Sequence, residues 1–384
     1  MIPEKQCTAD APKVVICVAG TRPEAIKMAP VILTLRERPE FLVYTLATGQ
    51  HSDMLDQAFA HFHIEPDHNL RVMREGQSLD YITSRVVEES GKLFDAVRPS
   101  MVLVHGDTTT TFAAALSSFY RHIPVGHVEA GLRSRRMDIP FPEEANRILA
   151  DRLSSLLFAP TPNARLNLIR EGFSEDSITI TGNTVIDALV WTIEHGVESR
   201  HDSALPGNDS PFIVFTAHRR ESWGEPLIGM CNAIRRILEA HREFFVLIPL
   251  HKNPSVRDSI RRELGKHPRV VFSEPLDYGS FVNAMQHCSL ILSDSGGIQE
   301  EAAALGKPVL VLRDVSERPE AMLEGTATLA GTSPEEIFNA ADTILSGVRF
   351  PEEVHRKIRN NPFGDGNASK KIADVIVKYF NDRS

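Results

Sequence analysis

Short apolar runs alternate with longer amphipathic segments along most of the chain. In the first half, the runs have the length of buried strands and lie at residues 13–19, 42–48, 101–105, 125–128 and 156–159. The segments between them have helical character and lie at residues 23–38, 52–62, 79–97, 110–121 and 143–155. Because parallel strands are joined by helical crossovers, this alternation predicts a parallel sheet with helices on both faces.

The alternation pauses once and then resumes. Residues 201–211 are polar and rich in turn-forming residues, and they are the best linker candidate. Beyond them, strands are predicted at residues 212–216, 245–249, 270–273, 290–293 and 309–312, and helices at 227–241, 278–287, 297–305 and 369–380. The pattern therefore predicts an α/β fold with two doubly wound halves. Ligands of such sheets bind beyond the carboxyl ends of the strands, so we expect the site in the cleft between the halves.

Composition and charge narrow the class of protein. The chain has 384 residues, of which 42% are hydrophobic and 24% charged, so it can bury a large core. Its 51 acidic and 42 basic side chains give a net charge of −9, which argues against nucleic-acid binding but allows an anionic small ligand in a cleft. No apolar run approaches the ~20 residues that span a bilayer. The N-terminus lacks a signal-peptide core, and we expect no membrane partner and a cytoplasmic location.

Metal and disulfide sites are not expected from the sequence. The four cysteines are far apart and form no CxxC pair: Cys7, Cys17, Cys231 and Cys288. Three histidines and one aspartate within residues 61–68 come nearest to a metal-ligand set, but His61 and His63 would not share a helical face. Solvated loop histidines are the preferred interpretation.

A polar motif follows the first predicted strand. The segment Gly20-Thr21-Arg22-Pro23-Glu24 combines a tight turn with a capping box of Thr21 and Glu24, which indicates a helix start. Capping does not require Arg22. A basic side chain at a helix N-terminus, where anions are favoured, is a candidate phosphate ligand.

Three carboxylates stand at or near later strand ends. Asp107 is interpretable equally as a helix N-cap or as a catalytic residue. Glu129 ends a buried strand, where it must be paired, with Arg133 as one candidate partner, or functional. Glu143 opens a helix together with Glu144, as first-turn acids often do. Together Asp107, Glu129 and Glu143 would place three carboxylates along one cleft wall, which supports acid–base chemistry.

The second half carries candidates for anion binding. His218 stands in the basic segment TAHRRE, and an anion site is preferred there over a structural histidine. Ser295, Gly296 and Gly297 would present bare backbone N–H groups at a helix start, as a diphosphate cradle. Glu301 lies about one turn further, where it can reach a ribose diol. The segment differs from the GxGxxG fingerprint and the chain has no P-loop, so neither NAD nor ATP chemistry is indicated.

Six motifs in this order resemble the non-hydrolysing UDP-N-acetylglucosamine 2-epimerase family: GTRPEAIKMAP, HGDTTTT, GHVEAGLRS, PFPEEANR, TAHRRES and SDSGGIQEEA. The resemblance covers nearly all of residues 13–380. It implies the two-domain fold of GT-B glycosyltransferases, with two Rossmann-like domains facing a central cleft. We expect a first domain at residues 1–185 with the acid–base carboxylates, a second at 186–365 that binds UDP, and a C-terminal helix within 366–384 that packs back on the first.

The resemblance also implies an activity. UDP-N-acetylglucosamine and UDP-N-acetylmannosamine would be interconverted by elimination of UDP to 2-acetamidoglucal and re-addition. No metal or nicotinamide cofactor would take part, and the setting would be polysaccharide biosynthesis. A homodimer is the default expectation for an enzyme of this size.

Individual positions match the family's functional residues. Asp107, Glu129 and Glu143 match the acid–base carboxylates, and Arg22 and His218 would stabilise the departing UDP. The other matched ligand-binding positions are Lys27, His251, Leu276, Phe281, Ser295, Gly296, Gly297, Glu301 and Arg318, with Leu276, Phe281 and His251 near the uracil. Gln50 and His51 match a pair beside a second, activating UDP-N-acetylglucosamine. Gly76 stands where activator-dependent members carry arginine, and Arg74 could replace that arginine.

Three other functions compete with epimerisation. A GT-B glycosyltransferase would use the same diphosphate cradle, but transfer needs at most one base, so the three carboxylates favour the epimerase. A hydrolysing epimerase would release free N-acetylmannosamine and UDP, and it resembles this chain only in part. A nucleotide-sugar binding module is disfavoured because three cleft carboxylates would repel an anionic ligand.

Overall fold

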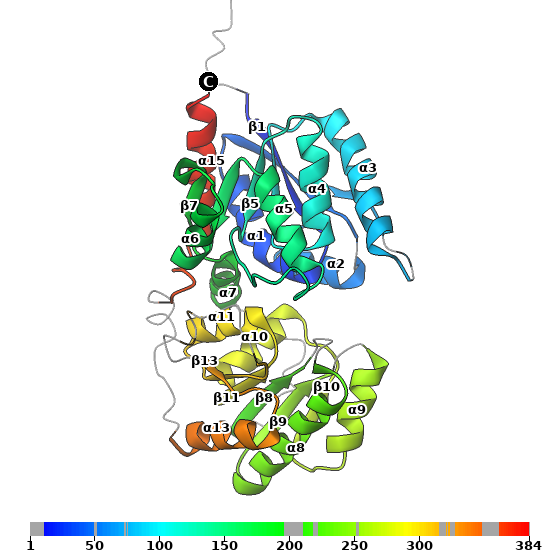
Figure 1. Ribbon diagram of the computed structural model, residues 1–384, viewed down its shortest axis with the longest axis vertical. Helices are drawn as coiled ribbons and strands as arrows, with labels where there is room; N and C mark the ends of the chain where they lie inside the picture. Colours follow the sequence, from blue (N-terminus) through cyan, green and yellow to red (C-terminus); the bar gives the residue numbers. More distant parts are fainter. Residues whose placement is uncertain are drawn as a thin grey trace, which may run out of the picture. The chain divides into compact units, whose positions relative to one another are not determined.

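The computed structural model describes residues 11–49, 52–72, 74, 76–195, 210–217, 222–250, 253–314, 320, 322, 327–347 and 361–383. The chain divides into two compact units (Figure 1). Unit 1 takes in the chain up to Thr184 and again from Asn367, and unit 2 is Val185–Gly366. Most of the predicted linker at residues 201–211 lies outside the described residues.

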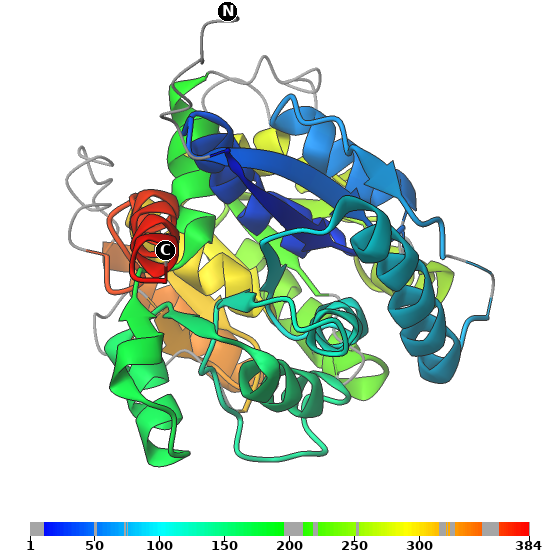
Figure 2. The same ribbon diagram turned by 90° about the horizontal axis from the view of Figure 1, so that it is seen from above.

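Unit 1 is built on a seven-stranded parallel sheet in the order β3-β2-β1-β4-β5-β6-β7. Its strands are β1 (Lys13–Ala19), β2 (Phe41–Ala47), β3 (His68–Asn69), β4 (Met101–His105), β5 (Val125–Val128), β6 (Leu156–Ala159) and β7 (Ile178–Ile180). Its helices are α1 (Arg22–Arg36), α2 (Ser52–His61), α3 (Leu79–Val97), α4 (Thr109–Phe119), α5 (Glu143–Leu153), α6 (Pro162–Arg170) and α15 (Ala368–Asn381), with a 3₁₀ turn at Glu175–Ser177. Seen from above, α1 and α2 lie on one side of the central strands and α3 and α4 on the other (Figure 2).

Unit 2 repeats this plan with six parallel strands in the order β10-β9-β8-β11-β12-β13. Its strands are β8 (Phe212–Thr216), β9 (Phe245–Pro249), β10 (Val270–Ser273), β11 (Leu290–Ser293), β12 (Val309–Val311) and β13 (Ala327–Leu329). Its helices include α7 (Thr184–Glu194), α8 (Glu225–Ala240), α9 (Pro254–Leu264), α10 (Tyr278–His287), α11 (Gly296–Leu305) and α13 (Pro334–Gly347). The predicted class, two doubly wound Rossmann-like α/β domains, is confirmed.

The sheet order shows where a ligand would bind. In each unit the direction of winding reverses between two neighbouring strands, β1 and β4 in unit 1 and β8 and β11 in unit 2. Crossover helices on opposite faces diverge at such a point and leave a crevice at the carboxyl ends of the strands. The motifs beginning at Gly20, Gly106 and Asp294 all stand at these strand ends. The winding therefore brings the motifs of each unit to one edge of its sheet.

The C-terminal helix α15 belongs to unit 1, although all of unit 2 precedes it in the sequence. It packs against α1, and Ile372, Ala373 and Ile376 are fully buried along one face. Arg38, just beyond α1, forms an ion pair with Asp374. The apolar stripe of α15 therefore completes the covering of one face of the unit 1 sheet.

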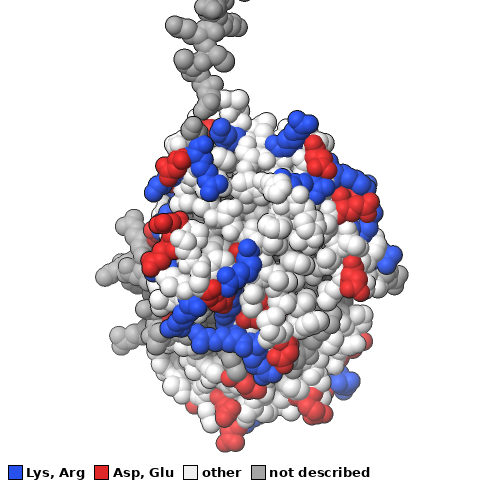
Figure 3. All heavy atoms as spheres, turned by 45° about the horizontal axis from the view of Figure 1, so that its top comes forward, with Lys and Arg blue, Asp and Glu red and all other residues white. Residues whose placement is uncertain are grey.

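The surface mixes charges of both signs. Figure 3 shows acidic and basic side chains interspersed with uncharged areas on the face drawn. Exposed ion pairs such as Lys92–Glu88 and Arg136–Asp138 are local in sequence, and such pairs contribute little to stability. None of the described helices is long and apolar enough to cross a membrane.

Candidate active site

Glu24 joins two loops at the switch point of unit 1. The predicted capping box is present: Glu24 Oε2 accepts from the backbone N–H of Gly20 at 2.7 Å and of Thr21 at 2.8 Å. Its Oε1 accepts from the hydroxyls of Thr108 at 2.5 Å and Thr111 at 2.9 Å, at the start of α4. Burial raises the pKa of Glu24, and these donors oppose the rise. The turn that carries Arg22, the first residue of α1, is thereby fixed to the turn after β4.

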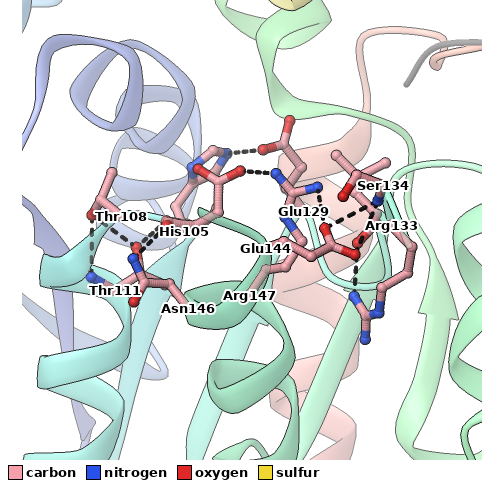
Figure 4. A network of polar contacts seen from close by, with 12 residues as sticks. His105, Thr108, Thr111, Glu129, Arg133, Ser134, Glu144, Asn146 and Arg147 are labelled. Atoms are coloured by element: carbon pink, nitrogen blue, oxygen red, sulfur yellow. Dashed lines mark hydrogen bonds and ion pairs between the residues drawn. The ribbon is translucent and has the colours of Figure 1, made fainter. Parts of the chain in front are cut away.

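Glu129 is held by polar groups from three other elements. It follows β5 with a left-handed backbone (φ 67°), and its side chain is 8% exposed. Its Oε1 forms an ion pair with Lys27 of α1 and accepts from Asn183 Nδ2 at 2.8 Å. Its Oε2 lies 3.8 Å from His105 Nε2 (Figure 4). The candidate pairing with Arg133 is wrong, because Arg133 binds Asp151 and Glu171 instead.

His105, the last residue of β4, is a neutral neighbour of Glu129. It is 3% exposed, and neither ring nitrogen has a hydrogen-bond partner among the residues the structure describes. Burial lowers the pKa of His105 to about 3, with Glu129 opposing the fall and Lys27 adding to it. Lys27, and not His105, is therefore the positive charge beside Glu129.

Asp107 is not a helix cap. The N-cap of α4 is Thr108, whose hydroxyl accepts from the backbone N–H of Thr111 at 3.3 Å. The carboxylate of Asp107 forms an ion pair with Arg147 of α5, and its backbone carbonyl accepts from Asn146 Nδ2 at 3.0 Å. Its side chain is 29% exposed, more than that of Glu129. Of the two interpretations of Asp107, the structure therefore removes the capping one.

Glu143 and Glu144 differ in their surroundings. Glu144 is fully buried and accepts from the backbone N–H of Ser134 at 3.0 Å and of Arg135 at 2.9 Å. It also lies 3.2 Å from Arg147 (Figure 4). Glu143 is the first residue of α5 and is half-buried. Glu144 therefore anchors the loop before α5, while Glu143 is the less buried of the two carboxylates.

Sequence reasoning missed a buried network beneath these carboxylates. Asp151 and His127 are fully buried, with His127 Nδ1 at 2.6 Å from Asp151 Oδ1. Asp151 Oδ2 accepts from Arg133 at 2.7 Å. Burial tends to raise the pKa of Asp151, but His127 and Arg133 outweigh it and the pKa is lowered. The sequence did hold a signal: Glu144, Arg147 and Asp151 form a charged stripe on one face of α5, where a core-facing helix normally carries apolar residues.

In unit 2, the turn between β11 and α11 leaves space at Gly297 among the described residues. Within the described part of the chain, Ser295, the N-cap of α11, makes no side-chain capping bond, and a Cβ added to Gly297 would meet none of the described atoms within 4 Å. Asp294 is fully buried and accepts from the hydroxyl of Ser222 at 2.7 Å. Across the switch point, the hydroxyls of Thr216 and Ser293 lie 2.9 Å apart. The helix start thus has open space beside its first backbone N–H groups, which suits an anionic ligand.

Glu301 lies further along α11. It is buried and accepts from Tyr278 Oη at 2.7 Å. Leu276, just before α10, is buried, and Phe281 on α10 is half-buried. These residues and the turn at Gly296 therefore lie on or just before two helices, α10 and α11, that contact each other.

A family model described as UDP-N-acetylglucosamine 2-epimerase matches residues 10–377. The chain belongs to the UDP-N-acetylglucosamine 2-epimerase family. It is 46% identical to UDP-N-acetylglucosamine 2-epimerase of Bacillus subtilis over 96% of each chain.

Solved structures that are similar to this chain point to the same family. The crystal structure of the Neisseria meningitidis UDP-GlcNAc 2-epimerase bound to UDP-GlcNAc is 44% identical, with a TM-score of 0.88 over 95% of this chain and 100% of that one. The S. aureus MnaA–UDP co-structure is 42% identical, with a TM-score of 0.86 over 96% and 97% of the chains. A glycosyltransferase of kitacinnamycin shares 13% identity and a TM-score of 0.62 over 96% of this chain and 99% of its own, and it shows the fold alone.

Several expected positions of this 2-epimerase family member lie outside the described residues: Gln50, His51, His218, His251 and Arg318. Arg74 is described, and its guanidinium lies over the ring of Tyr81, 3.5 Å from the centroid. No group of three His, Cys, Asp or Glu side chains in the described ranges could hold a metal ion.

Proposed function

We propose that this chain interconverts UDP-N-acetylglucosamine and UDP-N-acetylmannosamine, with Asp107, Glu129 and Glu143 as acid–base residues. The observation that carries the proposal is the placement of two carboxylates on neighbouring strand ends. β4 and β5 pair with His105 opposite Val128, so Asp107 and Glu129 follow adjacent strands. Each faces its own cation, Arg147 or Lys27. A cation stabilises a carboxylate in its charged form, the form that accepts a proton.

The chemistry requires two proton carriers. The proton on C2 of the sugar is not beside a carbonyl, so direct removal is very unfavourable. When the C1–O bond breaks, its electron pair leaves with UDP and C1 becomes positive. A carboxylate then takes the C2 proton, and the C2–H electron pair becomes the C1=C2 bond of 2-acetamidoglucal. A carboxylic acid on the other face returns a proton to C2, and UDP re-forms its bond to C1.

UDP must stay bound between the two steps. The open N-terminus of α11 offers backbone N–H groups for the diphosphate. Glu301, oriented by Tyr278, is the proposed ligand of the ribose hydroxyls. Arg22, Lys27, His218, His251, Leu276, Phe281 and Arg318 complete the proposed set. Positive groups and N–H dipoles aimed at the leaving diphosphate would lower the barrier most where water is excluded.

Two finer proposals concern regulation and assembly. Gln50, His51 and Arg74 would bind a second UDP-N-acetylglucosamine as activator, because the guanidinium of Arg74 keeps its N–H edge when it stacks on Tyr81. Rates with UDP-N-acetylmannosamine alone should then rise on addition of trace UDP-N-acetylglucosamine, and less so in Arg74→Gln. A homodimer is also proposed, and sedimentation at assay concentration tests it.

The activity is tested by incubating the protein with UDP-N-acetylglucosamine in D2O and following the reaction by proton NMR. UDP-N-acetylmannosamine should appear, with deuterium at C2 of both sugars. Asp107→Asn, Glu129→Gln and Glu143→Gln should each lower kcat by about 10²–10⁴-fold. Release of free N-acetylmannosamine would indicate the hydrolysing reaction instead. Near-normal turnover in all three variants would overturn the site assignment.

A further inference from the structure

The loops that carry Asp107 and Glu129 are joined underneath by one buried pair of side chains. His127 Nε2 lies 2.8 Å from the backbone carbonyl of Gly106, the residue before Asp107. Asp151 Oδ2 lies 3.3 Å from the backbone N–H of Gly131, two residues after Glu129. His127 and Asp151 bind each other at 2.6 Å, so the two loops share one connection.

The chemistry of the pair fixes the direction of each hydrogen bond. A carbonyl oxygen only accepts, so His127 Nε2 must donate to Gly106. Asp151 already accepts from Arg133 and from the backbone of Gly131. An ionised carboxylate only accepts, so His127 Nδ1 also donates. Charge-assisted bonds of this kind are short and strong, and they resist bending when fully buried.

Both loops contain a glycine with a left-handed backbone, and the one at Gly131 packs closely against its neighbours. Gly106 has a left-handed backbone (φ 72°), and a Cβ at this position would lie 3.5 Å from Glu129 Oε2. Gly131 is also left-handed (φ 84°), and a Cβ there would lie 2.4 Å from the carbonyl of Ala164. A shift of either loop therefore moves a carboxylate relative to its neighbour.

We infer that His127 and Asp151 are positioning residues that set the spacing between the carboxylates of Asp107 and Glu129. The inference rests on the proposed function, in which these two carboxylates handle the proton at C2. Neither positioning residue contacts the substrate in this scheme, because both are fully buried. Their effect is on which step follows the departure of UDP.

The most specific readout is the fate of 2-acetamidoglucal. After elimination, the intermediate either receives its proton and UDP again or leaves the enzyme. If the two carboxylates lose their spacing, re-addition slows relative to escape. The ratio of released UDP and glycal to epimerised product should then rise. This ratio is set within each turnover, so it does not depend on how much of a variant is folded.

Two substitutions at His127 each keep one of its two hydrogen-bond donors. His127→Gln can keep a donor at the position of Nε2, toward Gly106, whereas His127→Asn can keep only a donor at the position of Nδ1, toward Asp151. We expect His127→Asn and Asp151→Asn to lower kcat about 10- to 100-fold, the cost of a misplacement of roughly 1 Å. All three substitutions break the connection between the loops, His127→Gln at the bond to Asp151, so all three should raise the release ratio.

The matched control is a second histidine–aspartate pair. His241 Nε2 lies 2.9 Å from Asp342, and His241 is the C-cap of α8, at the amino side of the unit 2 sheet. His241→Asn removes a pair that is more exposed, with the Asp342 side chain 49% exposed, and it touches neither loop, so it should keep the wild-type release ratio. The ratio is measured by chromatography of UDP, glycal and both UDP-sugars during initial turnover.

The outcomes separate this inference from the proposed function. Wild-type release ratios in His127→Asn and Asp151→Asn would overturn the positioning role, whatever the fall in kcat. If Asp107→Asn and Glu129→Gln also turn over normally, the proposed acid–base residues are wrong. A raised ratio in all variants including His241→Asn would count against the inference, because release would then not depend on the His127–Asp151 pair.

Discussion

At the scale of single residues, the burial of His105 makes the stability of the protein depend on pH. Its imidazole lies beside Glu129, yet burial lowers the pKa of His105 to about 3. An unfolded chain would take up this proton near pH 6.5. Between these values the unfolded state binds more protons than the folded state. His105 therefore does not reduce the free energy of unfolding above pH 6.5, and the free energy of unfolding declines as the pH falls below that value.

His105→Leu tests this linkage. A group with such a shift changes the unfolding free energy by about 1.4 kcal/mol per pH unit. Wild-type protein should therefore lose about 2 kcal/mol more than His105→Leu between pH 6.5 and pH 5. Urea unfolding of both proteins at the two pH values measures the difference. Parallel losses would mean that His105 is protonated in the folded state.

At the scale of elements, two glycines at strand-to-helix turns have opposite requirements. Gly20 precedes α1, and a Cβ there would lie 2.3 Å from the hydroxyl of Thr110 and 2.6 Å from that of Thr48. Gly297 lies in the first turn of α11, where a Cβ would meet no atom of the residues that the structure describes within 4 Å. The first glycine serves close packing inside unit 1. The second leaves space that the proposed diphosphate would use.

Gly297→Ala should therefore separate binding from stability. We expect an unchanged or slightly higher Tm, because alanine favours a helix by about 1 kcal/mol over glycine in a helix interior. The KM for UDP-N-acetylglucosamine should rise about 10-fold, because the new methyl group crowds the cradle. Gly347→Ala is the control and should change neither, because a Cβ at this position, the end of α13, would also meet no atom of the described part of the chain within 4 Å. An unchanged KM in Gly297→Ala would mean that the diphosphate does not bind at this turn.

The packing of α15 gives a prediction of stability alone. Ile372 is fully buried, whereas Lys370 on the same helix is exposed. Ile372→Ala should lower the free energy of unfolding by about 2–5 kcal/mol, through lost transfer energy and a cavity. Lys370→Ala should stay within about 0.5 kcal/mol of the wild type. Chemical denaturation of the two variants decides; equal values would mean that α15 does not stabilise unit 1.

The strands that sequence reasoning found are those with long apolar runs. The five buried residues of β4 and the apolar run of β8 stand out because central parallel strands are covered on both faces. β3, β7 and β13 were not predicted. They have only two or three residues, lie at the sheet edges and are partly exposed, so they carry no apolar run.

The candidate site residues could be predicted from the sequence only where they follow an apolar strand. Asp107 and Glu129 stand out because a charge directly after an apolar strand is conspicuous. Their partners do not stand out in the sequence, because Asn183 is 54 positions from Glu129 and Arg147 is 40 positions from Asp107. Such pairs are set by the winding of the sheet. A pattern along the chain carries no information about them.

At the scale of the whole molecule, unit 2 is a candidate for independent folding. One hydrophobic core cluster of its described residues draws only on residues between Ile213 and Leu345. Residues 185–366 produced alone should give a cooperative thermal transition and bind UDP in calorimetry, without epimerase activity. Gly297→Ala in the same fragment is the matched control and should weaken UDP binding. A fragment without a cooperative transition would show that unit 2 depends on unit 1.

The position of α15 has a consequence during synthesis. Unit 1 is interrupted by unit 2, so the ribosome makes every residue of the second unit before the last helix of the first. At ~5–20 residues per second, this interval lasts roughly 10–40 s. During that time the face of α1 against which α15 packs lacks this helix on the nascent chain. Unit 2 can therefore finish folding before unit 1. A chaperone that shields apolar helix faces would bind unit 1 during this interval.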